Sequence, residues 1–143
     1  LEPYHLKHFT HKILSDTTMW LSRLFRFPDT SAFFHEEERE GLVRVCRLAL
    51  HQRYPKFASD GYEALYPRPP VFYVSAACKL GLGQYLCAQL GLPLSCLCSV
   101  PVKTSYGLVH KMDVVALEKL IEDDKSSGKT PVLIVAYAGT PIV

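Results

Sequence analysis

Apolar and polar positions change their spacing along the chain, and each spacing predicts a different element. Between residues 6 and 25 the apolar side chains recur at roughly helical intervals, and Pro28-Asp29 then marks a turn. A second helix is predicted over residues 36–53, because glutamates open it and arginines lie toward its end, which complements the helix dipole. The core face predicted for this second helix consists of Leu42, Val45, Cys46, Ala49 and Leu50.

The middle of the chain is predicted to form a strand, a helix and a second strand. A proline-rich loop over residues 54–70, with a short helical turn near its end, leads into an apolar strand over residues 71–75. An apolar helix is then expected over about 83–90, because Gly91 stands where a helix commonly ends on glycine. A second strand is predicted over residues 94–100.

The last third of the chain predicts one more helix and one more strand. Asp113 is a suitable N-cap for an amphipathic helix that ends near residues 126–128. Residues 132–137 are continuously apolar, which is typical of a parallel strand covered on both faces. The resulting order of strand, helix, strand, helix, strand predicts an α/β fold with βαβ units and a mainly parallel sheet.

Composition narrows the classes of protein that this chain resembles. Hydrophobic residues make up 48% and charged residues 21% of the 143 positions, which is ordinary for a globular domain. The formal net charge of +2 is small and the cations are scattered, so nucleic acid is not a predicted partner. No apolar run is long enough to predict a membrane span.

The first residues and the cysteines of the chain indicate whether it is part of a longer protein and in which cellular compartment it resides. The first residues form no signal peptide, and the absence of an initiator Met leads us to expect that the sequence is part of a longer chain. The five cysteines are odd in number and include no CxxC pair. This pattern predicts reduced, largely buried thiols in an intracellular, cytoplasmic protein.

Two glycine-containing segments imitate nucleotide-binding motifs. The run 126–130, Ser-Ser-Gly-Lys-Thr, resembles the end of a P-loop, but Asp123 stands where that motif requires glycine and the loop follows a helix. Gly81-Leu82-Gly83 follows a predicted strand, but Leu86 occupies the place of the third glycine of a dinucleotide fingerprint. Neither segment therefore predicts a nucleotide site.

Clusters of histidines and glutamates are predicted to be solvated helix faces and not metal sites. Three histidines spaced three residues apart, from His5 to His11, would drift around a helix and not converge on one ion. The consecutive residues Glu36, Glu37 and Glu38 would point in different directions. The sequence thus assigns no metal ligand.

Cys78-Lys79 is the pair with the most suggestive position. It follows the first predicted parallel strand, and open α/β sheets bind ligands at the carboxyl ends of their strands. Lys79 would lower the pKa of the neighbouring thiol or meet an anion. The alternative, an inert pair, stays open.

The ordered set of segments resembles the group II pyridoxal-phosphate (PLP) dependent decarboxylases. The segment from Trp20 to Pro28 resembles the run that leads into the cofactor domain of that family, and Val71–Ser75 resembles its aromatic-x-Ser strand. The segment from Met112 to Thr140 resembles the family's pattern of a Leu-rich helix, an apolar strand and Ala-x-x-Gly-Thr. Further stretches that resemble one divergent branch of the family are residues 34–42, 81–87, 93–98 and 110–113.

This resemblance implies a fold and an activity. The fold would be part of a fold type I PLP-dependent transferase-like large domain, with residues 1–30 as a helical lead-in and 31–143 as the partial large domain. The full-length parent would be a homodimeric carboxy-lyase of carboxylic acid metabolism that decarboxylates an amino acid. PLP would act as the electron sink for the carbanion that remains after carbon dioxide leaves.

The same resemblance places few cofactor contacts in this chain. It puts Lys79 where the family stacks a histidine on the cofactor, and it puts Thr140 beside the cofactor. The family's phosphate loop falls on residues 35–38, where carboxylates replace glycine and serine. The acidic partner of the pyridinium nitrogen and the aldimine lysine follow later in the family, so no catalytic residue is assigned. Two hypotheses result: a catalytically impaired portion of a carboxy-lyase that is inactive as this isolated chain, or a pseudoenzyme that keeps the fold as a scaffold or interaction module without PLP chemistry.

Overall fold

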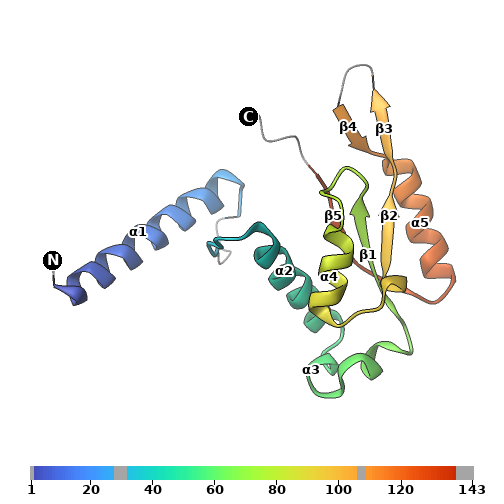
Figure 1. Cartoon of the computed structure of the whole chain (residues 1–143), viewed down its shortest axis with the longest axis horizontal. Helices are drawn as coiled ribbons and strands as arrows, with labels where there is room; N and C mark the ends of the chain where they lie inside the picture. Colours follow the sequence, from blue (N-terminus) through green and yellow to red (C-terminus); the bar gives the residue numbers. More distant parts are fainter. Residues whose placement is uncertain (1, 28–31, 106–108, 138–143) are drawn as a thin grey trace. The chain divides into compact units, whose positions relative to one another are not determined.

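The structure is a computed structural model of the 143-residue chain that describes residues 2–27, 32–105 and 109–137 (Figure 1). The chain divides into two compact units, Leu1–Glu38 and Arg39–Val143. The boundary predicted between residues 30 and 31 stays a prediction. Among the described helices, none combines the length and the apolar content that crossing a membrane requires.

The first unit contains one long helix, α1 (Pro3–Leu24), which confirms the helix predicted from apolar spacing. Pro3 fits the first helical position because its missing N–H would have no partner there in any case. The side chains of His5, His8 and His11 are exposed, in agreement with the predicted solvated face. An apolar stripe on the same helix is 46% to 64% exposed and consists of Leu6, Phe9, Ile13, Leu14, Trp20 and Leu24.

Helix α1 ends in a left-handed turn that satisfies its last carbonyl groups. The Arg26 N–H donates to the Arg23 carbonyl at 2.9 Å, and the Phe27 N–H donates to the Ser22 carbonyl at 2.8 Å. This pair of bonds is a Schellman motif, whose left-handed residue is usually glycine. Here that residue is Arg26, with a φ of 61°.

The second unit is built on a three-stranded parallel sheet. Its strands are β1 (Pro70–Ser75), β2 (Leu97–Val100) and β5 (Thr130–Val135), in the order β2-β1-β5. Helices α4 (Leu82–Leu90) and α5 (Val114–Ser126) belong to the two crossover connections (Figure 1). The predicted α/β fold with a mainly parallel sheet is therefore confirmed.

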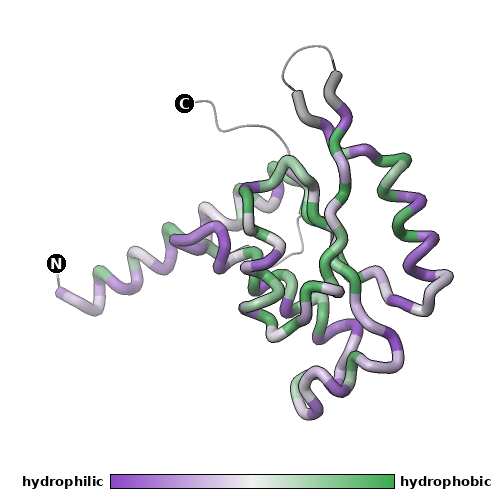
Figure 2. The backbone as a smooth tube through the Cα atoms, turned by 45° about the vertical axis from the view of Figure 1, so that its right-hand side comes forward, coloured by the Kyte–Doolittle hydropathy of each residue, from purple (hydrophilic) through white to green (hydrophobic). Residues whose placement is uncertain are grey.

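Helices cover both faces of this sheet. On one face α2 (Glu38–Arg53) and α4 pack against Phe72 and Val74 of β1, and on the other face α5 packs against Val71 and Tyr73. Figure 2 shows the strands as largely hydrophobic and α5 as alternating hydrophobic and hydrophilic residues. Of the predicted core face of α2, Cys46 and Leu50 are fully buried, whereas Val45 is 49% exposed and that prediction is wrong.

Several boundaries differ from the predictions. Residues predicted as the start of the second strand form a 3-10 turn, η2 (Leu94–Cys96), and the last strand lies two residues earlier than predicted. The loop before β1 contains α3 (Phe57–Asp60) and a 3-10 helix, η1 (Gly61–Leu65). Each change is a shift of a few residues at an element end, where local patterns are weakest.

A short antiparallel hairpin between β2 and α5 was absent from the predictions. Its strands are β3 (Val102–Ser105) and β4 (Val109–Met112). Asp113 ends the hairpin and caps α5 as predicted, because its side chain accepts a hydrogen bond from the Ala116 N–H at 3.1 Å. The Lys103 ammonium lies 3.0 Å from the same carboxylate, and these two contacts lower the pKa of Asp113.

A polar network joins β1, α5 and the start of β5. The fully buried Tyr73 hydroxyl donates to Asp124 Oδ2 at 2.9 Å, and Lys129 Nζ donates to Asp124 Oδ1 at 2.9 Å. Burial and the bond to Asp124 both raise the pKa of Tyr73, so the phenol stays neutral. No buried side-chain polar atom of the described residues lacks a partner.

We predict that Asp124→Ala lowers the free energy of unfolding of the chain by about 1–3 kcal/mol, because it leaves the buried Tyr73 hydroxyl without an acceptor. Tyr73→Phe should cost less, since Asp124 keeps its bond to Lys129. The measurement is urea unfolding, with Asp123→Ala, an exposed neighbour on α5, as the control. Equal effects of the two alanine variants would contradict the role of this network.

A second prediction concerns the end of α1. Arg26→Gly should stabilise the last turn by about 1 kcal/mol, because a side chain in the left-handed region costs roughly that amount. Amide hydrogen exchange at Phe25 to Phe27 should then slow by about fivefold. The control is Arg23→Gly, which places glycine inside the helix and should speed exchange. Unchanged or faster exchange in Arg26→Gly would show that Arg26 is not strained.

Candidate functional site

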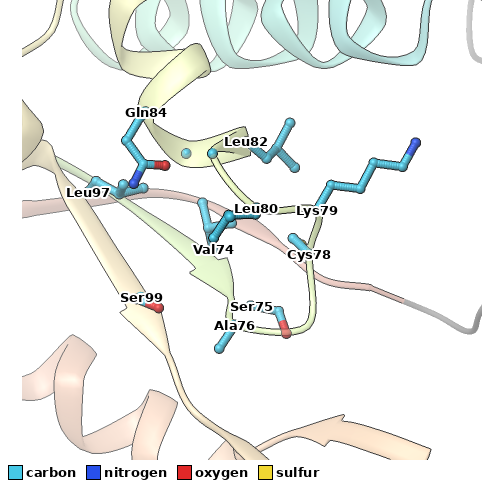
Figure 3. Close-up of a pocket in the computed structure, with 12 residues that line it drawn as sticks. Val74, Ser75, Ala76, Cys78, Lys79, Leu80, Leu82, Gln84, Leu97 and Ser99 are labelled. Atoms are coloured by element: carbon cyan, nitrogen blue, oxygen red, sulfur yellow. The ribbon is translucent and has the colours of Figure 1, made fainter.

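A cavity of about 200 Å³ lies at the carboxyl end of β1 (Figure 3). Its walls are the end of β1, the loop into α4, the first turn of α4 and the neighbouring strand β2. This is the edge of the sheet where open α/β folds place their ligands. The lining residues are Val74, Ser75, Ala76, Cys78, Lys79, Leu80, Gly81, Leu82, Gly83, Gln84, Leu97 and Ser99.

Backbone hydrogen bonds fix the loop that forms one wall of the cavity. The Ala76 N–H donates to the Val100 carbonyl of β2 at 2.8 Å, and the Cys78 N–H donates to the Ser75 carbonyl at 3.0 Å. The Ser75 hydroxyl oxygen accepts from the Ala77 N–H at 3.2 Å. The loop therefore turns tightly after β1.

Two glycines allow α4 to begin close to the sheet. Gly81 precedes the helix with a φ of 80°, a backbone conformation that disfavours other residues. A Cβ atom on Gly83 would lie 2.6 Å from the Leu97 methyl groups, so only glycine lets the helix approach β2 without displacing that side chain. Gly81 thus has a conformational role at the start of α4, and Gly83 has a packing role.

Of the two predicted cofactor-binding residues, the structure describes Lys79 but not Thr140. Lys79 lines the cavity, but its exposed side chain extends away from Gln84 and Ser99 (Figure 3). Thr140 lies outside the described residues. A cofactor role for either residue stays a prediction.

Cys78 lies where the sequence placed it, at the carboxyl end of a parallel strand. Its half-buried thiol is 3.9 Å from the Val135 carbonyl, a weak contact that joins the loop to the end of β5. Of the other four thiols, Cys46, Cys87 and Cys96 are buried, and Cys98 is half-buried like Cys78. Burial raises the pKa of Cys46 to about 11, and burial also raises the pKa values of Cys87, Cys96 and Cys98.

The chemistry available in the cavity follows from its side chains. Ser75 and Ser99 offer hydroxyls and Gln84 offers an amide, which suit hydrogen bonding to a small polar ligand. None of the lining residues has an aromatic ring, an imidazole or a carboxylate. Within the described ranges, no group of three or more His, Cys, Asp or Glu side chains is arranged to hold a metal ion.

Three residues that line the cavity, Gln84, Leu97 and Ser99, were not identified as candidate site residues from the sequence. Leu97 and Ser99 join Lys79 and Cys78 because β2 lies beside β1 in the register that pairs Val74 with Ser99, and Gln84 joins them from the first turn of α4. The position of Ser99 one residue before the end of a predicted strand was the available signal. It gave no information about which strand would be its neighbour.

The chain is similar over its whole length to a set of curated proteins, although no protein-family model matches it. It is 57% identical over 141 residues to "Pyridoxal-dependent decarboxylase domain-containing protein 1" of Danio rerio, covering 99% of this chain and 19% of that protein. The Homo sapiens protein of the same name is 57% identical over 143 residues, covering 100% and 18%. "Putative pyridoxal-dependent decarboxylase domain-containing protein 2" of Homo sapiens is 56% identical, covering 100% and 30%. The chain thus spans about a fifth to a third of the length of these relatives.

Solved structures share the fold. The crystal structure of mouse CSAD matches with a TM-score of 0.82 and 22% identity, covering 97% of this chain and 28% of that one. The structure of Oryza sativa TDC with PLP and tryptamine matches with a TM-score of 0.66 and 17% identity, covering 86% and 27%. At these identities the two structures show a shared α/β fold, and the resemblance in sequence rests on the relatives named above. The resemblance and the fold inferred from the sequence are therefore confirmed.

The exposure of the cysteines predicts their order of alkylation. In a brief iodoacetamide reaction at neutral pH, the half-buried thiols of Cys78 and Cys98 should be labelled before the buried thiol of Cys46, whose pKa is also raised. Labelling of Cys46 should rise only as the pH approaches 11, or when the chain unfolds. Peptide mapping by mass spectrometry gives the extent at each site, with the denatured chain as the control. Rapid labelling of Cys46 in the folded chain would contradict its burial.

Proposed function

We propose that this chain forms part of the large domain of a PLP-dependent carboxy-lyase family protein whose cofactor chemistry is impaired. The similarity to proteins named for a pyridoxal-dependent decarboxylase domain supports the family. The parallel sheet with a cavity at its carboxyl edge supports a ligand site of the type that this family uses. When bound, PLP would supply an electron sink for decarboxylation of an amino acid.

The residues that line the cavity are the observation that supports impaired PLP chemistry. In the family pattern, the cofactor ring stacks against a histidine at the place of Lys79. A flexible ammonium gives no flat face for a heteroaromatic ring, and the exposed Lys79 side chain extends away from Gln84 and Ser99 (Figure 3). Leu80 is fully exposed, and apart from Cys78 and the cationic Lys79 the other lining residues are aliphatic, small or neutral polar. The described residues therefore do not fit the cofactor ring.

The segment that the resemblance assigns to the phosphate of PLP, residues 35–38, is equally unsuited to binding that phosphate. Glu36 and Glu37 precede α2, and Glu38 is its first residue, with all three side chains exposed. A helix N-terminus favours an anion, but three carboxylates oppose a phosphate at the same place. The guanidinium of Arg39 lies over the Tyr85 ring at 5.4 Å, so this nearby cation packs against α4. These residues weaken phosphate binding and do not replace the family's glycine-rich loop.

The second candidate function is a pseudoenzyme that keeps the decarboxylase fold as a scaffold or interaction module. The specific observation in its favour is that the core around β1 is fully packed while the cavity lining departs from the family pattern. In either case we propose that the longer protein is a homodimer and resides in the cytoplasm, a location that its free cysteines support. An active form would take an amino acid as substrate.

The first experiment is borohydride trapping on the longest expressed protein that contains these 143 residues, incubated with PLP and mapped by mass spectrometry. We expect scattered, substoichiometric pyridoxyl-lysine, because ring stacking and the phosphate cradle are both lost. Oryza sativa TDC, whose solved structure contains PLP, serves as the positive control. A single lysine labelled stoichiometrically would overturn the impairment, and its loss on mutation of that lysine would establish a working site.

The second experiment tests the carboxylates before α2. Glu36→Gln, Glu37→Gln and Glu38→Gln combined should tighten PLP binding to the same protein by about three- to tenfold at low salt, because the repulsion of phosphate is removed. The gain should shrink as salt is added. The matched control is Glu118→Gln with Glu122→Gln on α5, which removes exposed carboxylates elsewhere. If the two variants bind PLP with equal affinity, these three glutamates do not account for weak PLP binding.

A further inference from the structure

We draw no further inference here: the strongest candidate, the exposed apolar stripe of helix α1 formed by Leu6, Phe9, Ile13, Trp20 and Leu24, carries no proposal because nothing in the described part of the chain shows what covers it.

Discussion

The burial of strand β1 on both faces and along both edges is the constraint on which the second unit depends. Its residues from Val71 to Val74 are at most 6% exposed, and β2 and β5 pair with its two edges. Burial of each large apolar side chain contributes about 1.5–3 kcal/mol, so four such residues are comparable with the whole net stability of a small domain. The helices on the two faces, and the register of the two outer strands, follow from this one strand.

The same constraint explains the one polar group in the middle of the strand. Tyr73 points toward α5, where its ring fills the core and its hydroxyl must find an acceptor. Asp124 provides that acceptor from the last turns of α5 and also binds Lys129 at the entry to β5. One carboxylate thus joins β1 to the distant helix α5 and to the residue just before β5, which links the packing of the strand to the position of the crossover helix.

The parts of the fold that the sequence predicted are those with strong local signals. The burial of 71–75, the N-cap at Asp113 and the helical spacing of 6–25 each act within a few turns or one strand, and all three were confirmed. The β3–β4 hairpin was missed because strands of four residues carry too short a pattern to be distinguished from a loop. The cavity was only half predicted: Cys78 and Lys79 follow from a rule about strand ends, but Ser99 and Leu97 depend on the register between β1 and β2.

The contrast between β1 and the loop after it shows which positions the packing of the fold constrains and which it does not. Every position up to Ser75 is fixed by packing, so a substitution there would cost stability whatever the protein does. From Ala76 to Leu80 the side chains are exposed or only half-buried, and backbone bonds hold the loop without them. Packing therefore constrains the residue at position 79 only weakly. Similarity in fold consequently supports the α/β architecture alone, whereas the chemistry has to be argued from the few residues that line the cavity.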